Sequence, residues 1–435
     1  MSFESEQVCL ADVCSDVSYG YTEGATAQPI GPKFLRITDI QGGSFDWSTV
    51  PFCPATEDNV RKYQLQVGDI VVARTGNSTG ENAQVVQEPP AAVFASYLIR
   101  FRPNSGRVNP FFVGYQLRSE RFKQHVLAVR GGSAQPGANA KQLGAFTFHL
   151  IPRNLQDEAV ESLRTLDDRI ALLRETNATL EAIAQALFKS WFVDFDPVRA
   201  KQEGRAPEGM DEATAALFPD GFEESELGLV PRGWGVGSLS ALAILNPESW
   251  TATMHPDTVA YIDLANTKNN EIAQVTDYVF EEAPSRARRV LRDGDTIVGT
   301  VRPGNRSFAF IHQATSNLTA STGFAVLRPR KIENTEFVYL MATHDSSIEH
   351  LAHVADGGAY PAVRPEVVVG IRAVLPSNEV MKAFHDVAAL LLGSVAENQQ
   401  KAQTLATLRD TLLPRLISGQ LRLPEADALL AEFAA

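Results

Sequence analysis

Apolar residues recur at helical spacing over two stretches of the chain. The first stripe consists of Leu163, Leu166, Ile170, Leu173, Asn177, Leu180, Ala184, Leu187 and Trp191. The second consists of Ala388, Leu391, Val395, Asn398, Ala402, Leu405, Arg409, Leu412 and Leu416. Spacing of three and four sustained over four heptads predicts two helices of roughly forty residues, each about 60 Å long. Helices of that length are best buried against each other, although each could pack on its own globular part instead. The asparagines on the two stripes are a device that can fix helix register.

The rest of the chain is duplicated at an offset of about 225 residues. The matched segments are Leu65–Val72 with Leu291–Val298, Arg102–Pro103 with Arg328–Pro329, Phe112–Val113 with Phe337–Val338, Arg130–Ser133 with Asp356–Ala359, and Ile151–Pro152 with Leu375–Pro376. They occur in the same order with nearly the same spacing. The period is too long for a solenoid, so each copy is a whole domain with the helix that follows it.

Within each copy the pattern is mixed. Asp69–Arg74 and Asp295–Thr300 are short β-branched runs bounded by glycine turns, which predicts strands. The stretches 109–129 and 336–354 are predicted to be helical, and Gly131-Gly132 and Gly357-Gly358 to be loops. The fold class is therefore α+β, with two similar globular domains, each followed by a long helix.

The predicted segments follow from these boundaries. They are a first globular domain (1–152), a first long helix (153–192), a connector (193–228), a second globular domain (229–376), a second long helix (377–420) and a C-terminal tail (421–435). The connector contains Pro197, Pro207 and Pro219 with a run of acids from Glu223 to Glu226. Its acidity is expected to be a solvated surface.

Composition places the chain among folded soluble proteins. Of its 435 residues, 44% are hydrophobic and 21% are charged, which is an ordinary balance. It shows neither an apolar run long enough for a transmembrane helix nor the pattern of a signal peptide. Three cysteines (Cys9, Cys14 and Cys53) suit a reducing compartment. We therefore expect a cytoplasmic protein without membrane association.

The net charge of −13 argues at first against a nucleic-acid ligand, because phosphate contacts need Lys and Arg. The charge is unevenly distributed, however. Residues 153–228 carry 8 Lys/Arg and 17 Asp/Glu, whereas residues 1–152 carry 13 of each and residues 229–376 carry 13 and 15. The globular domains are thus nearly neutral. A DNA-binding face would have to be locally basic, or a partner would have to supply phosphate contacts.

Two long motifs resemble the specificity subunits of Type I restriction–modification systems. One is Leu187–Val198 (LFKSWFVDFDPV) with Leu217–Asp220 and Ser225–Trp234 (SELGLVPRGW), and the other is Leu408–Gln420 (LRDTLLPRLISGQ). The resemblance spans the whole chain, duplication included. It implies that each globular domain recognises one half of a split, asymmetric DNA target, while the helices pack as an antiparallel coiled coil and set the gap.

The resemblance also implies partners and cofactors. Two modification subunits would bind S-adenosylmethionine and methylate adenine, and two restriction subunits would use ATP and magnesium for translocation and cleavage. The chain itself would hold no cofactor and no metal. A specificity subunit serving methylation alone is a neighbouring possibility, and the sequence does not separate the two.

Candidate DNA contacts follow from the chemistry of base recognition, in which Arg pairs with guanine and Asn or Gln with adenine. Loops after the predicted strands and helices carry such residues in both copies. The candidates for base contact are Arg74, Thr75, Asn77, Ser78, Arg130, Ser133, Gln135, Thr300, Arg302, Asn305, Arg306 and Tyr360. Candidate phosphate contacts are Lys33, Arg36, Lys141 and Arg364. The alternative for each residue is an ordinary exposed turn.

Catalytic motifs are weak. An amino-methyltransferase needs an Asn/Asp-Pro-Pro-aromatic motif, and Asn246-Pro247-Glu248-Ser249 lacks the second proline and the aromatic residue. Gly76–Gly80 is followed by Glu81, which would repel phosphate. We therefore expect a non-catalytic DNA-binding subunit. The rival hypotheses are a self-contained DNA methyltransferase, which would transfer methyl groups by itself, and a coiled-coil scaffold for proteins only.

Overall fold

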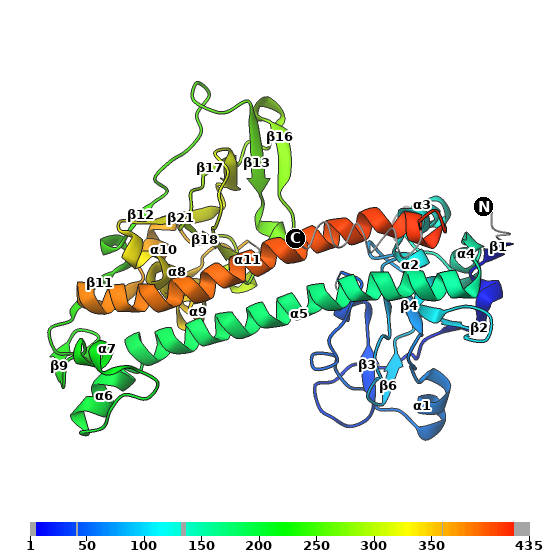
Figure 1. Ribbon diagram of the computed structural model, residues 1–435, viewed down its shortest axis with the longest axis horizontal. Coiled ribbons are helices and arrows are strands. Elements are labelled where there is room, and N and C mark those ends of the chain that lie inside the picture. The colour runs from blue at the N-terminus through cyan, green and yellow to red at the C-terminus, as the bar shows by residue number, and fades with distance from the viewer. Residues whose placement is uncertain (1–5, 41, 132–135, 359, 422–435) are drawn as a thin grey trace. The chain divides into compact units, whose positions relative to one another are not determined.

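The computed structural model describes residues 6–40, 42–131, 136–358 and 360–421 (Figure 1). The chain forms two compact units. Unit 1 contains the residues up to Ala171 and those from Ala402 onward, and unit 2 contains Leu172–Lys401. Two helices of 40 residues, α5 (Arg153–Phe192) and α11 (Asn378–Ile417), contribute to both units. The boundary between the units therefore runs through both helices and cuts across the predicted segments 153–192 and 377–420.

Unit 1 is built around a four-stranded antiparallel sheet with the order β2-β7-β4-β5. Its strands are β1 (Glu6–Cys9), β2 (Cys14–Tyr19), β3 (Lys33–Leu35), β4 (Ile70–Ala73), β5 (Asn82–Gln84), β6 (Ala92–Phe94), β7 (Leu98–Pro103) and β8 (Thr147–Leu150), and its shorter helices are α1 (Glu57–Tyr63), α2 (Pro110–Arg118), α3 (Glu120–Val129) and α4 (Ala140–Gly144). Strand β3 pairs in parallel with β6, and β1 pairs antiparallel with β8. All four residues of β4 are buried, as its unbroken apolar sequence predicts.

Unit 2 contains a second four-stranded sheet with the order β12-β21-β18-β19. Its strands are β9 (Phe222–Ser225), β10 (Gly228–Pro231), β11 (Gly235–Ser238), β12 (Ala243–Leu245), β13 (Thr258–Ile262), β14 (Thr267–Lys268), β15 (Glu271–Ile272), β16 (Thr276–Val279), β17 (Ala287–Val290), β18 (Thr296–Gly299), β19 (Phe308–Phe310), β20 (Leu318–Ser321), β21 (Phe324–Pro329) and β22 (Arg372–Leu375), and its shorter helices are α6 (Asp196–Gln202), α7 (Glu212–Ala216), α8 (Thr335–Thr343), α9 (Asp345–Val354) and α10 (Pro365–Val369). A further sheet has the order β16-β13-β20-β17, in which β13 and β20 are parallel.

The two units confirm the duplication. The strand order β2-β7-β4-β5 is repeated by β12-β21-β18-β19, and the helices α2, α3 and α4 are repeated by α8, α9 and α10. One buried ion pair is also repeated. Arg102 binds Asp69 at 2.7 Å in unit 1, and Arg328 binds Asp295 at 2.8 Å in unit 2. In each case the carboxylate belongs to the turn before the central strand and the arginine to its antiparallel neighbour.

Helices α5 and α11 pack side by side and antiparallel within each unit (Figure 1). In unit 1, Asp167 near the start of α5 accepts a hydrogen bond from Arg409 near the end of α11, at 2.8 Å. In unit 2, Asn398 donates to Asn177 at 3.0 Å, and Asn177 donates to the carbonyl of Val395 at 3.0 Å. The coiled-coil expectation is thus confirmed, and the two seam asparagines pair with each other.

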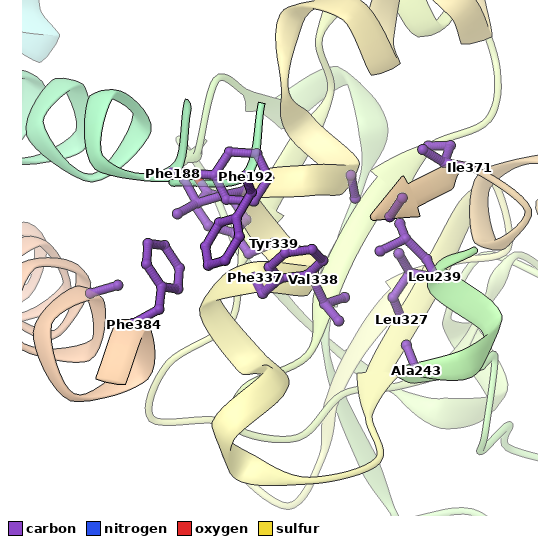
Figure 2. Close-up of a cluster of buried hydrophobic side chains, with 14 of the residues drawn as sticks. Phe188, Phe192, Leu239, Ala243, Leu327, Phe337, Val338, Tyr339, Ile371 and Phe384 are labelled. Carbon is purple, nitrogen blue, oxygen red and sulfur yellow. The ribbon is translucent and has the colours of Figure 1, made fainter. Parts of the chain in front are cut away.

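The helices also complete the cores of the globular parts. In unit 1, Leu163 of α5 and Leu412 of α11 lie in the same cluster as Phe112 and Phe148. Figure 2 shows the corresponding cluster of unit 2, where Phe188 and Phe192 of α5 and Phe384 of α11 meet the side chains of α8. The two alternatives left open by the sequence therefore both hold, because the helices bury one face on each other and another on the globular parts.

The predicted connector is a folded segment. It forms α6, α7 and β9, the first strand of the antiparallel hairpin β9–β10, and the ring of Phe218 lies 5.0 Å from that of Trp191 at the end of α5. Its acidic residues Glu223, Glu224 and Glu226 are exposed, as predicted. Among the described residues, no helix is both long and apolar enough to cross a membrane.

Candidate nucleic-acid interface

The predicted loops of unit 1 are hydrogen-bonded to each other. The loop at residues 74–80 leaves strand β4, and the described residues 130–131 and 136–138 follow helix α3. The amide of Gly76 donates to the carbonyl of Pro136 at 2.8 Å, and the amide of Ala138 donates to the carbonyl of Arg74 at 2.9 Å. We call these two segments the loop pair of unit 1. Ser133 and Gln135, both predicted base contacts, lie outside the described residues.

Unit 2 repeats this arrangement bond for bond. The amide of Arg302 donates to the carbonyl of Pro361 at 2.7 Å, and the amide of Val363 donates to the carbonyl of Thr300 at 2.9 Å. Residues 300–306 together with residues 356–358 and 360–363 form the loop pair of unit 2. The sequence reasoning selected four loops, and the fold brings them together as two equivalent pairs, one in each unit.

Each loop pair holds an arginine against a tyrosine ring. The guanidinium carbon of Arg74 lies 4.7 Å from the ring centre of Tyr19, and that of Arg302 lies 5.0 Å from the ring centre of Tyr360. Such stacking orients the flat guanidinium, whose N–H groups point outward in its own plane. Tyr360 is 73% exposed and Tyr19 is 41% exposed. In unit 2 the exposed guanidinium of Arg302 therefore lies beside an exposed aromatic ring, an arrangement suited to recognition of guanine in the major groove. In unit 1 Arg74 is half-buried, and among the described residues its Nε is buried without a hydrogen-bond partner.

The backbone of the unit 2 loop is strongly curved. Arg302 and Arg306 both have left-handed conformations, with φ of 48° and 59°, on either side of the turn Pro303–Asn305. Arg306 is held by the protein itself, because Nε donates to Asn269 at 2.9 Å and a terminal nitrogen donates to Asp345 at 2.8 Å. Arg302 and Asn305, in contrast, are exposed.

The other predicted base contacts differ in accessibility. Asn77 and Arg130 are exposed, and Thr75 and Ser78 are half-buried. Thr300 is buried, and its hydroxyl donates to the carbonyl of Gly323 at 2.8 Å. The hydroxyl of Thr300 therefore already has a partner inside the fold, and Thr300 contributes to the loop pair through its backbone carbonyl, which accepts from Val363.

The predicted phosphate contacts fall into two groups. Lys33 donates to the carbonyl of Val50 at 2.7 Å, and Arg36 binds Asp39 at 2.7 Å, so both cations already have intramolecular partners. Lys141, inside the first turn of α4, and Arg364, the residue before α10, are both exposed, so each lies near the start of the helix that follows a loop pair.

Sequence reasoning missed two groups of residues. Tyr19 stands at the end of β2, and nothing in the sequence placed it beside Arg74. The run Arg286–Arg289 overlaps strand β17, where Arg288 lies 4.7 Å over the ring of Phe280. Among the described residues, Nε of Arg289 is buried without a hydrogen-bond partner, and burial lowers the pKa of this side chain. Three arginines in four residues were the available signal.

The weak catalytic motif has structural roles. Asn246 accepts a hydrogen bond from the amide of Val326 at 2.9 Å, and Glu248 binds Arg292 at 2.9 Å and also Arg328. Among the described residues, no three His, Cys, Asp or Glu side chains are grouped so that they could hold a metal ion.

The architecture defines a class of protein with two copies of one α+β domain, each followed by a long helix, and with an arginine-bearing loop pair in each copy. A family model described as the Type I restriction modification DNA specificity domain matches residues 7–182. The specificity subunit of the Type I restriction enzyme HindI from Haemophilus influenzae is 24% identical, with 96% of this chain and 99% of the relative aligned. The MjaIX specificity subunit from Methanocaldococcus jannaschii is 21% identical over 74% of this chain and 71% of the relative.

A solved structure has the same fold. It is that of the Type I restriction–modification S subunit from M. genitalium, with a TM-score of 0.54 and 12% identity, covering 95% of this chain and 96% of the other. The chain is thus similar in sequence and in fold to the specificity subunits of Type I restriction–modification systems. These subunits are the non-catalytic DNA-recognition components of their systems, and the rival hypothesis of a self-contained methyltransferase is not favoured.

Proposed function

We propose that each unit recognises one half of a split, asymmetric DNA target through its loop pair. The observation that carries this proposal is the repetition of the loop pair in the two units. An arginine lies beside a tyrosine ring in each unit, although at non-equivalent positions: Arg74 beside Tyr19 in unit 1, and Arg302, which corresponds to Gly76, beside Tyr360 in unit 2. The two copies present the same kind of donor on different surrounding sequences, as expected of two half-sites that differ. Helices α5 and α11 are the elements that join the two units, and we propose that their length sets the gap of unread base pairs.

Partners supply what the chain lacks. The globular domains are nearly neutral in sequence, and two of the four predicted phosphate contacts already have intramolecular partners, so the isolated subunit should bind DNA weakly. We propose that two modification subunits carrying S-adenosylmethionine add phosphate contacts and methylate adenine. Two restriction subunits would add ATP- and magnesium-dependent translocation and cleavage, with the whole complex in the cytoplasm.

The direct test is a genome-wide map of methylated adenines in cells that contain the modification subunits, with and without this chain. A bipartite motif that depends on the chain supports the proposal. Methylation that is unchanged by the presence of the chain, or that follows a single uninterrupted motif, contradicts it.

One residue makes the test specific. We expect Arg302→Ala to weaken binding to the cognate site and to relax one target position, at a cost of about 1–3 kcal/mol. Arg330→Ala is the matched control, because Arg330 is an exposed arginine of the same unit outside the loop pair. Unchanged affinity together with unchanged sequence preference in the Arg302 variant would refute the assignment of this loop.

A further inference from the structure

Unit 2 contains two consecutive asparagines in a left-handed turn. Asn269 and Asn270 join strands β14 and β15, with φ of 46° and 64°. A two-residue hairpin turn with positive φ at both positions is the type I′ turn, which favours asparagine and glycine. The sequence therefore explains the turn itself, but Asn270 is 6% exposed, which is unusual for a polar residue at the tip of a hairpin.

One side of this turn holds the end of the DNA-reading loop. The amide of Asn269 donates to the carbonyl of Arg306, and Nε of Arg306 donates to the side-chain oxygen of Asn269, both at 2.9 Å. The amide of Asn270 donates to the carbonyl of Phe308 at 2.9 Å, and its side-chain oxygen accepts from the amide of Phe310 at 2.8 Å. These bonds fix the last residue of the loop at residues 300–306 and the edge strand β19 that follows it.

The other side of the turn holds the two long helices. The side-chain nitrogen of Asn270 donates to Glu181 of α5 at 2.6 Å, and Gln399 of α11 donates to the backbone carbonyl of Asn270 at 3.0 Å. Arg174 of α5 lies 4.0 Å from Glu271, the next residue of the hairpin. The side-chain nitrogen of Asn270 thus contacts α5, its backbone carbonyl contacts α11 and its side-chain oxygen contacts strand β19.

Unit 1 has the same turn without the side chains. Gly42 and Gly43 follow the short helix Ile37–Asp39, as Asn269 follows Leu264–Asn266, and they have φ of 56° and 81°. The position that corresponds to Arg306 is Gly80, with φ of 95°. Glycine adopts this backbone conformation easily but offers no side-chain bond. The link through asparagine side chains is therefore a property of unit 2.

From this juxtaposition we propose that Asn270 is a positioning residue, which ties the DNA-reading loop of unit 2 to the helix pair. Recognition of the half-site by unit 2 then depends on the contact of Asn270 with α5 and α11. Recognition of the other half-site by unit 1 does not depend on such a side chain. This inference rests on the proposed function, because it takes residues 300–306 to be a loop that reads DNA.

The test variant is Asn270→Gly in the full chain, assembled with its modification subunits. Glycine keeps the left-handed backbone and reproduces the turn of unit 1, so the variant removes the side-chain bonds without adding strain. Methylation rates are compared on the cognate duplex and on duplexes with single substitutions in either half-site. In the half-site that Arg302→Ala identifies, we expect discrimination between the cognate and the substituted duplexes to fall roughly tenfold or more, because a hydrogen bond to a charged group is lost. Discrimination in the other half-site should be unchanged.

Asn246→Gly is the matched control. Asn246 also has a left-handed conformation, with φ of 47°, and its side-chain oxygen also accepts from a strand amide of unit 2, that of Val326. Among the hydrogen bonds of the described residues, none joins Asn246 to α5, to α11 or to the loop at residues 300–306. Equal loss of discrimination in both asparagine variants would show a general effect on the sheet and would overturn the proposal.

A second pair of variants exchanges donor and acceptor. Asn270→Asp keeps the acceptor for Phe310 but places a carboxylate against Glu181, so it should also lose discrimination. Adding Glu181→Gln restores a hydrogen bond with reversed direction, and we expect this double variant to recover most of the discrimination. A double variant no better than Asn270→Asp contradicts the tie to α5.

Hydrogen exchange gives a readout without DNA. In Asn270→Gly we expect faster exchange in residues 300–312, because the amide of Phe310 loses its acceptor, and no change in residues 70–84 of unit 1. A wild-type complex with a bipartite target, combined with an Asn270→Gly variant that keeps full discrimination, would overturn the inference and leave the proposed function intact. A wild-type complex without sequence-dependent methylation would refute both, even if the exchange result showed the tie to exist.

Discussion

The junction of the two long helices with unit 2 depends on Phe384, and its truncation should be severely destabilising. Phe384 of α11 is 0% exposed. Its ring lies 4.9 Å from that of Phe192 and 6.1 Å from that of Phe188, both on α5 (Figure 2). It also lies 5.7 Å from the ring of Trp191 on the same helix. These contacts place one aromatic ring of α11 among three of α5, where a smaller side chain would leave a void.

The magnitude follows from this environment. Replacing a buried phenylalanine by alanine costs about 3–5 kcal/mol through lost burial and the cavity that remains. Of that cost, about 0.5–1.5 kcal/mol comes from the edge-to-face contact with Phe192. A folded domain has a total stability of about 5–15 kcal/mol, so Phe384→Ala should remove a large share of the stability of unit 2. The melting temperature should fall by about 10 °C, because a unit of this size loses about 2–4 °C per kcal/mol.

Urea unfolding followed by tryptophan fluorescence measures this change. Trp191 and Trp234 both belong to the cluster that contains Phe384, so they report on unit 2. Leu390→Ala is the control, because Leu390 lies on the same helix and is 73% exposed, and its truncation should change the unfolding free energy by less than about 0.5 kcal/mol. A cost below about 1 kcal/mol for Phe384→Ala, or equal costs for the two variants, would refute the reasoning that this ring holds the helices to unit 2.

Two further predictions concern the helix pair. Burial, with a smaller contribution from Glu271, raises the pKa of Glu181 despite the hydrogen bond from Asn270. The unfolding free energy of unit 2 should therefore fall as the pH rises through that raised pKa. In urea titrations between about pH 4 and pH 8, Glu181→Gln should flatten this pH dependence, and an unaltered slope would argue against burial of the charge. Deleting residues 168–174 and 401–407 together removes one heptad from each helix between the Asp167–Arg409 and Asn177–Asn398 pairs. This should shorten the gap in the methylated motif by about three base pairs, since seven residues span about 10 Å, and an unchanged gap would rule out the helices as the spacer.

The sequence predicted those parts of the fold that depend on local periodicity. The two long helices are evident because apolar residues, such as Leu163 and Ile170 in the first and Leu412 in the second, recur at spacings of three and four over many turns. A pattern of that length has few alternatives. Phe188 lies off the expected seam, and its burial could not be predicted from it, whereas Phe384 continues the spacing of the second stripe by one position. Both side chains belong to the core of unit 2, and a stripe that serves two surfaces at once is wider than a coiled-coil seam.

The candidate site shows the same division. The loops were found because arginine, asparagine and glycine follow strands at matching places in the two copies. The partners of those loops were not found, because they depend on tertiary contacts between distant positions. Tyr19 reaches Arg74 because β2 pairs with β7 and β7 in turn pairs with β4, and Asn270 reaches Glu181 across 89 residues of sequence. No periodicity carries that information.

Unit 1 is assembled from two separate stretches of the sequence, and unit 2 begins inside α5 and ends inside α11, which changes what a recognition domain is in this protein. The core of unit 1 includes Leu408, Leu412 and Leu416 from the end of α11, and the buried side chain of Gln116 donates to the carbonyl of Ile417 at 3.2 Å. The first half of the chain therefore does not close its own core. A predicted boundary at residue 228 separates two similar sequences, but it does not separate two folding units. The duplication produces two reading surfaces, and each of them is completed by a helix that the other copy contributes.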